Sequence, residues 1–194
     1  TYAMGDGDQP LGRPLGIPGR LEARWRTAGV RISPVNIGHP GYDTAEYNGI
    51  IEQMVADGYK IRVLDRQVDS VNSVTRGKPT SDIRTDLLAA EALIAPQPMI
   101  HRLGPGGQDL VDHASDWQAG TVAERTWVKT NRASTVNAGI ETTVTNAATM
   151  AINSPYFFDE TSDVHLSQAG YTQAEADIHA REKVILDALA GVTL

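Results

Sequence analysis

An acid and a histidine two residues apart form the pattern in this chain that is best suited to chemistry. Asp163 and His165 stand directly before the run Leu166-Ser167-Gln168-Ala169-Gly170-Tyr171, after which a helical pattern continues toward the C-terminus. A neutral imidazole accepts a proton as a general base, and a nearby carboxylate fixes its tautomer and orientation. A lone Asp-x-His is more often an incidental pair on a surface loop, so the rest of the chain has to decide.

The composition is that of an ordinary soluble globular protein, and it argues against several classes of partner. The 194 residues are 41% hydrophobic and 21% charged, with a formal net charge of −7. This acidic balance argues against nucleic acid or an anionic membrane as the main partner. No apolar run is long enough to span a bilayer. The chain starts at Thr1 rather than Met, like a trimmed mature product, which favours an extracellular or periplasmic location.

The residues that commonly hold metals are few and badly spaced. The chain has no cysteine, which excludes disulfides and thiolate metal ligands. His101, His113 and His179 have no partners at metal-ligand spacing, so we expect surface or core-edge roles for them. No metal and no other cofactor is therefore expected. Trp117 and Trp127 are expected to be packing residues, although a tryptophan on an edge loop can stack on a sugar.

Strand-like and helix-like segments alternate along the chain, which is typical of a three-layer α/β fold with a parallel sheet. Strands are expected at 2–4, 30–37, 61–64, 98–103 and 156–158. Helices are expected at 21–28, 45–57, 81–94, 122–152 and 173–190, with 8–19 and 108–120 as loops. The sequence thus predicts one domain over residues 1–194, an α/β/α sandwich around a parallel sheet of about five strands.

The turns that follow the expected strands should lie at one edge of the sheet. Such folds bind ligands beyond the carboxyl ends of their strands. The turns at 5–7, 38–44, 70–79 and 163–165 all follow strands, so we expect them to share that edge. The third strand is unusual for a central parallel strand, since Arg62, Asp65 and Arg66 stand close together in it.

Four short blocks carry a resemblance to a known family. They are Met4-Gly5-Asp6-Gly7, the stretch from Asn36 to Thr44, Ser70-Val71-Asn72-Ser73, and the stretch from Asp163 to Tyr171. The residues and the order of these blocks resemble those of the SGNH (GDSL-like) hydrolases, which are esterases with a flavodoxin-like three-layer fold. The His39-Pro40-Gly41-Tyr42 wording of the second block is closest to the carbohydrate O-acetyl esterases of that family.

The resemblance implies a catalytic role for residues of each block. Position 7 corresponds to the serine nucleophile, His165 to the general base, and Asp163 to the acid that orients the base. Gly7, Gly41 and Asn72 correspond to the donors of the oxyanion hole. The implied substrate is a small acyl ester, chiefly acetyl, on a carbohydrate or a similar polar alcohol. Further substrate contacts are implied for three residues, Asp6, His39 and Asp69.

The chain departs from the family at the nucleophile. Gly7 has no side-chain oxygen, so the sequence as written cannot run the covalent mechanism of the family. Three explanations fit: an engineered removal of the nucleophile, a natural pseudoenzyme, or a misassigned residue. The alternative function is a non-catalytic domain that binds a carbohydrate or an ester on the same fold.

Two further departures leave the register of the site open. In the third block Asp69 competes with Asn72 for the oxyanion position. The acid stands two residues before His165 rather than the commoner three, where Ser162 stands. Asp159 is a second candidate for the orienting acid, and a backbone carbonyl can also serve.

Overall fold

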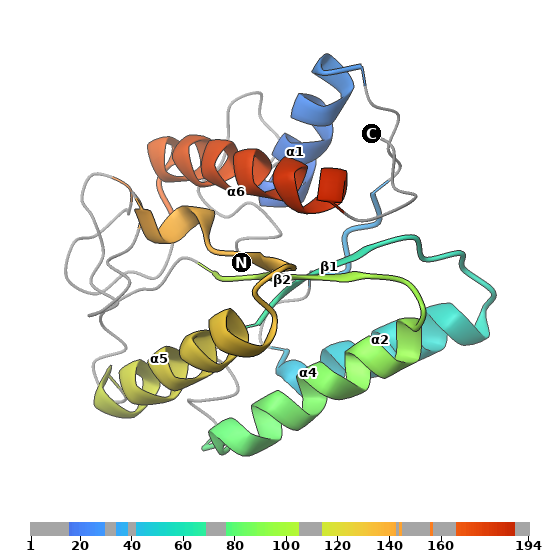
Figure 1. Ribbon diagram of the computed structural model, residues 1–194, viewed down its shortest axis with the longest axis vertical. Helices are drawn as coiled ribbons and strands as arrows, with labels where there is room; N and C mark the ends of the chain where they lie inside the picture. Colours follow the sequence, from blue (N-terminus) through green and yellow to red (C-terminus); the bar gives the residue numbers. More distant parts are fainter. Residues whose placement is uncertain are drawn as a thin grey trace. The chain divides into compact units, whose positions relative to one another are not determined.

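The computed structural model describes residues 16–29, 34–38, 42–68, 77–104, 114–142, 144, 156 and 166–188 (Figure 1). Contacts divide the chain into two compact units. Unit 1 comprises residues 1–40, 105–114 and 138–194, and unit 2 comprises residues 41–104 and 115–137. Each unit is described by itself below, and the expectation of a single domain stays a prediction.

Unit 2 contains a parallel sheet, as the alternation of elements predicts. Strands β1 (Leu64–Gln67), β2 (Met99–Arg102) and β3 (Val136–Asn137) lie in that order, and both neighbouring pairs are parallel. Leu64 pairs with Met99, and His101 pairs with Val136. The mixed α/β character is therefore confirmed, with three parallel strands in the described part of the chain.

Two of the expected strands of unit 2 can be compared with the structure directly. The expectation at 98–103 is confirmed by β2, which is buried along its whole length. The strand expected from residue 61 begins only at Leu64, because the preceding residues follow directly on the turn that ends helix α2. Strand β3 was not expected, because the short apolar run around Val136 fits a helix as well as a strand.

Three helices of the described part belong to unit 2. They are α2 (Thr44–Ala56), α4 (Thr80–Ile94) and α5 (Ala114–Asn131). Helices α2 and α4 lie side by side, as Figure 1 shows. Their buried apolar residues are Ile51, Ile83, Leu87, Ala90 and Ile94. The sequence pattern of α2 places Val55 on its apolar face, but Val55 is 42% exposed, so the buried face is narrower than the pattern indicates.

The helix expected at 122–152 is confirmed over 122–131 and wrong over 132–142, while residues 143 and 145–152 lie outside the described ones. Helix α5 begins within the expected loop at 108–120 and ends at Asn131; a turn, β3 and the 3₁₀ helix η1 (Gly139–Thr142) follow. Gly139, the first residue of η1, has a packing role in unit 1. A Cβ atom at Gly139 would lie 2.3 Å from the carbonyl oxygen of Asp177 on α6, so only glycine fits there.

Unit 1 contains two packed helices, α1 (Gly16–Thr27) and α6 (Gln168–Ala188) (Figure 1). Helix α1 buries Ile17, Leu21 and Trp25, a four-residue spacing that places them on one face. It starts inside the loop expected at 8–19, because Pro18 falls in the first turn, where no backbone N–H is needed.

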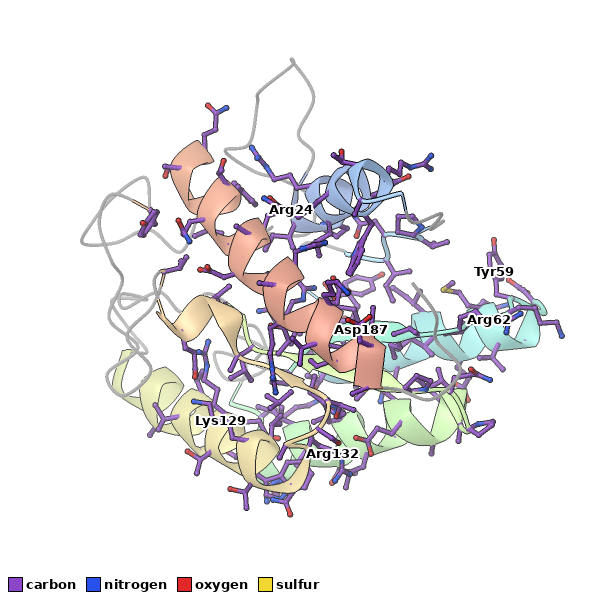
Figure 2. All side chains as sticks on the ribbon, turned by 45° about the horizontal axis from the view of Figure 1, so that its top comes forward. Arg24, Tyr59, Arg62, Lys129, Arg132 and Asp187 are labelled. Atoms are coloured by element: carbon purple, nitrogen blue, oxygen red, sulfur yellow. The ribbon has the colours of Figure 1, made fainter. Side chains whose placement is uncertain are left out.

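The interface of α1 and α6 also contains charge. Arg24 extends from α1 toward α6, where its guanidinium binds both carboxylate oxygens of Glu175 (Figure 2). The Trp25 indole N–H donates to Glu182 Oε2 over 3.1 Å. Both glutamates are nearly buried, at 5% and 8% exposure, so these bonds satisfy carboxylates that burial would otherwise penalise.

The strand expected at 30–37 is wrong over the part that the structure describes. Residues 34–38 form no strand, and Val35 is 60% exposed. The Asn36 side chain instead accepts a hydrogen bond from the N–H of Gly38, which is the geometry of a turn. Tyr156 lies in a bend. The strand expected at 2–4 and residues 30–33 and 157–158 lie outside the described residues.

Candidate functional site

The residues that the sequence assigns to the site all lie outside the described residues. They are Asp6, Gly7, His39, Gly41, Asp69, Asn72, Asp163 and His165. The structure does describe the flanks of three of the four blocks: 42–44 in the second, 67–68 and 77–78 around the third, and 166–171 in the last. The contacts of these flanks are therefore the part of the site that can be built from the structure.

The start of α6 is fixed by hydrogen bonds directly after His165 in the sequence. The N–H of Ser167 donates to the carbonyl oxygen of Tyr156 over 2.9 Å, and the Ser167 hydroxyl accepts from the N–H of Gly170 over 3.2 Å. Ser167 thus caps the helix, which explains why α6 begins five residues earlier than the expected 173. Leu166 is fully buried and anchors the chain before the cap.

The Gly-Tyr pair that ends the last block has a structural reason. A Cβ atom at Gly170 would lie 2.0 Å from the carbonyl oxygen of Tyr156, so the close approach of the two segments requires glycine. Tyr171 is fully buried in unit 1. The segment from Leu166 to Tyr171 is therefore a rigidly packed platform, which we call the α6 start.

The second block ends in a capping box at the start of α2. The Asp43 carboxylate accepts hydrogen bonds from the N–H groups of Ala45 and Glu46 over 2.9 and 3.0 Å. The Glu46 carboxylate in turn accepts from the N–H of Asp43 over 2.7 Å. The N-cap is therefore Asp43, because an acid followed three residues later by Glu closes the reciprocal pair. Thr44, whose residue type also suits a cap, is instead the first residue of the helix.

A network of charged and polar side chains joins this cap to α4 and to Lys78, five residues after the end of the third block. Lys78 Nζ lies 2.6 Å from Asp86 Oδ2 on α4 and 3.6 Å from Asp43 Oδ2. The hydroxyl of Thr44 also donates to Asp86. Each of these ionised side chains is less than one-fifth exposed, which makes the network stronger than a surface ion pair. We call Asp43, Thr44, Lys78 and Asp86 the α2-cap network.

Arg66 explains part of the unexpected charge in the third expected strand. It lies on β1 at 7% exposure, and its guanidinium binds Asn48 Oδ1 and the carbonyl oxygen of Thr44 on α2. Burial lowers the pKa of Arg66 to about 10, so the group remains charged at neutral pH. Asp65 forms a separate pair with Arg102 on β2, at 3.0 Å. Both charged residues of β1, Asp65 and Arg66, therefore have hydrogen-bonding partners, and Arg66 connects β1 to the start of α2.

His101 forms a hydroxyl–imidazole–carboxylate series that the sequence did not suggest. Its Nδ1 lies 2.9 Å from Thr135 Oγ1, and its Nε2 lies 2.6 Å from Glu91 Oε1. Arg132 also binds both oxygens of Glu91, at 2.6 and 2.8 Å. The pKa of His101 is lowered, and the main cause is burial of the ring, which is 2% exposed. The series lies within unit 2, and its polar partners satisfy the nitrogens of a buried imidazole.

The other singled-out side chains of the described part also have packing roles. The guanidinium carbons of Arg84 and Arg132 lie 4.6 and 5.2 Å from the centre of the Trp127 ring, which favours packing over sugar stacking. The centres of the His179 and Trp25 rings lie 4.2 Å apart. The pKa of His179 is lowered, mainly by burial. His179 is thus a core-edge residue, as expected. His113 lies outside the described residues, as do the side-chain contacts of Trp117.

The hollows and ion-binding groups of the described residues offer no further site. A shallow depression on α2 brings together no catalytic set, its lining being Tyr42, Glu46, Gly49, Ile50, Gln53 and Met54. Among the described residues, no three His, Asp or Glu side chains come close enough to hold a metal ion. None of the helices in the described part combines the length and the apolar character needed to cross a membrane.

Comparisons with known proteins found no match to this chain among family models, curated proteins or solved structures. The functional argument therefore rests on the blocks and on the contacts of their flanks. Sequence reasoning missed Arg66, Lys78 and Asp86. The charge of the third expected strand was the one signal for them, because a buried charge requires a partner.

Proposed function

We propose that the chain is an ester hydrolase of the SGNH type, built for small acyl esters of carbohydrates, whose nucleophile position is occupied by Gly7. His165 is the general base of this site and Asp163 orients it. The oxyanion hole consists of the N–H groups of Gly7 and Gly41 and the side chain of Asn72. The surrounding fold is a flavodoxin-like three-layer sandwich with about five parallel strands, of which the described sheet of unit 2 is a part.

The observation that carries this proposal is the α6 start. Residues 166–171 continue the last block, and their contacts include the Ser167 cap, the close approach at Gly170 and the burial of Tyr171. A general base must be held within hydrogen-bond reach of the proton that it accepts. A rigid platform that begins one residue after His165 supports that requirement.

The flanks of the other blocks add support. The third block follows β1 at its carboxyl end, and ligands of parallel α/β sheets bind beyond that end. The α2-cap network joins Asp43, two residues after Gly41, to Lys78, six residues after Asn72. The two segments that carry these proposed oxyanion donors therefore have ends that are tied together within unit 2.

The chemistry of the site requires a hydroxyl at position 7. In a Gly7→Ser protein, the new oxygen would attack the ester carbonyl while His165 takes its proton. The oxyanion so formed would be held by the three donors and would collapse to an acyl-enzyme, with His165 returning the proton to the departing alcohol. Water activated by the same imidazole would then release the acid and restore the hydroxyl.

A second function is favoured by one specific observation, the absence of an oxygen at position 7. A chain with Gly7 can keep the shape of the site and bind an acetylated sugar without cleaving it. This alternative uses the same cleft and predicts binding of the intact ester by the unmodified protein.

The two functions are separated by restoring the nucleophile. The Gly7→Ser protein should hydrolyse p-nitrophenyl acetate and acetylated sugars, with activity that falls as the pH drops through about 6.5, where an ordinary histidine takes up a proton. The unmodified protein is the matched control and should be inactive. A folded Gly7→Ser protein that cleaves none of these esters would exclude the hydrolase, and binding of acetylated sugars would then support the second function.

A further inference from the structure

The α2-cap network differs from an ordinary surface ion pair in what it connects. Lys78 lies between two carboxylates on separate elements, Asp43 at the start of α2 and Asp86 on α4. Its Nζ also lies 3.4 Å from Thr44 Oγ1, and that hydroxyl reaches Asp86 as well. One ammonium group therefore joins the start of α2 to the neighbouring helix.

A second layer of contacts holds the start of α2 from the sheet. Asn48 donates from its side-chain amide to the carbonyl oxygen of Asp86 over 2.8 Å and also binds the Arg66 guanidinium. Arg66 Nη2 donates to the carbonyl oxygen of Thr44 over 2.8 Å. The start of α2 is thus held from α4, from β1 and from Lys78, although a helix cap alone needs only the capping box.

We propose that Lys78 and Asp86 form a positioning pair that holds the start of α2 in the geometry that the reaction needs. The inference rests on the proposed function, in which Gly41, two residues before Asp43, donates an N–H to the oxyanion. Oxyanion donors must be preorganised, and a small displacement of such a donor costs a large part of the rate. Lys78 and Asp86 touch no reacting atom in this account and act through the cap.

The pair is tested first by hydrogen exchange of the full chain, which does not depend on activity. Lys78→Met should speed exchange of the Ala45 and Glu46 amides by about tenfold, because those amides are protected by the Asp43 cap that Lys78 supports. Lys78→Arg should restore the slow exchange. The matched control is Lys183→Met, which breaks an exposed lysine–aspartate pair on α6 and should leave both amides unchanged.

The same variants in the Gly7→Ser background test the effect on the reaction. Lys78→Met should lower kcat by about tenfold with little change in KM, since a displaced oxyanion donor weakens transition-state binding alone. Lys78→Arg should recover most of kcat. Unchanged exchange in Lys78→Met, or an unchanged kcat despite faster exchange, would overturn the positioning pair. An inactive Gly7→Ser protein whose exchange at the cap responds to Lys78→Met would instead overturn the proposed function.

Discussion

Gly170 is the residue at which the α6 start and the chain before it come closest. Glycine inside a helix normally costs stability relative to alanine, because its backbone loses more freedom on folding. Here the missing side chain leaves room for the carbonyl oxygen of Tyr156, to which Ser167 also donates. The resemblance of the last block to its family and the packing against Tyr156 therefore both favour glycine at this position, for separate reasons.

Gly170→Ala should destabilise the protein by roughly 1–3 kcal/mol, the cost of forcing an extra carbon into a filled space. The free energy of unfolding in urea measures this. Gly49→Ala is the matched control, because Gly49 also lies in a helix but has nothing near its missing Cβ. That change should stabilise by about 0.5–1 kcal/mol. Equal effects of the two substitutions would show that Tyr156 does not lie against Gly170.

His101 should make the stability of the protein depend on pH. Its pKa is lowered from 6.5, mainly by burial, with Arg132 and Arg66 also disfavouring the charged ring and Glu91 favouring it. A histidine whose folded pKa is below its unfolded value contributes stability that is complete above the unfolded pKa and is lost as the pH falls below it. The melting temperature should therefore fall as the pH drops from about 6.5 toward the folded pKa of His101.

The matched variant for that titration is His101→Gln, which retains a polar side chain without a titrating group. Its melting temperature should vary less with pH over the same range, although His179, whose pKa is also lowered, should leave part of the slope. A His101→Gln protein with the full slope of the parent would contradict the buried series of Thr135, His101 and Glu91.

At the scale of the element, Asp43 supplies the N-cap of α2. Asp43→Ala removes the side-chain half of the capping box and should destabilise by about 0.5–2 kcal/mol, the usual range for losing an N-cap. Ser81→Ala is the control at the start of α4, where no side chain caps the helix. That control should change the free energy of unfolding by less than about 0.5 kcal/mol. Equal losses in the two variants would argue against the capping box.

The elements that the sequence predicted well are those with strong local signals. Strand β2 and helix α4 are bounded by prolines, and their apolar residues are regularly spaced. The helix predicted after the end of α5 was wrong because the short Ala-, Thr- and Val-rich runs there have no distinctive hydrophobic period. The start of α6 was missed because its determinant is tertiary: Ser167 caps the helix while Gly170 packs against Tyr156, fourteen residues earlier.

At the scale of the whole molecule, the sequence predicted the parallel α/β character but not the supports of the proposed site. Catalytic blocks are short and local, so they can be recognised one at a time along the chain. Lys78, Asp86 and Arg66 each contact the start of α2, which is far from them in sequence. The roles assigned to His165, Asp163 and Gly41 remain predictions, because those residues lie outside the described ones.

The central claim, that position 7 and His165 belong to one ester-hydrolysing site, is tested most directly by a fluorophosphonate, which reacts with base-activated serines. Intact mass should show one phosphonyl group on the Gly7→Ser protein and none on the parent or on Gly7→Ser/His165→Ala, because the hydroxyl needs the imidazole to become a nucleophile. A folded Gly7→Ser protein that stays unlabelled, or a double variant that labels equally fast, would contradict the claim.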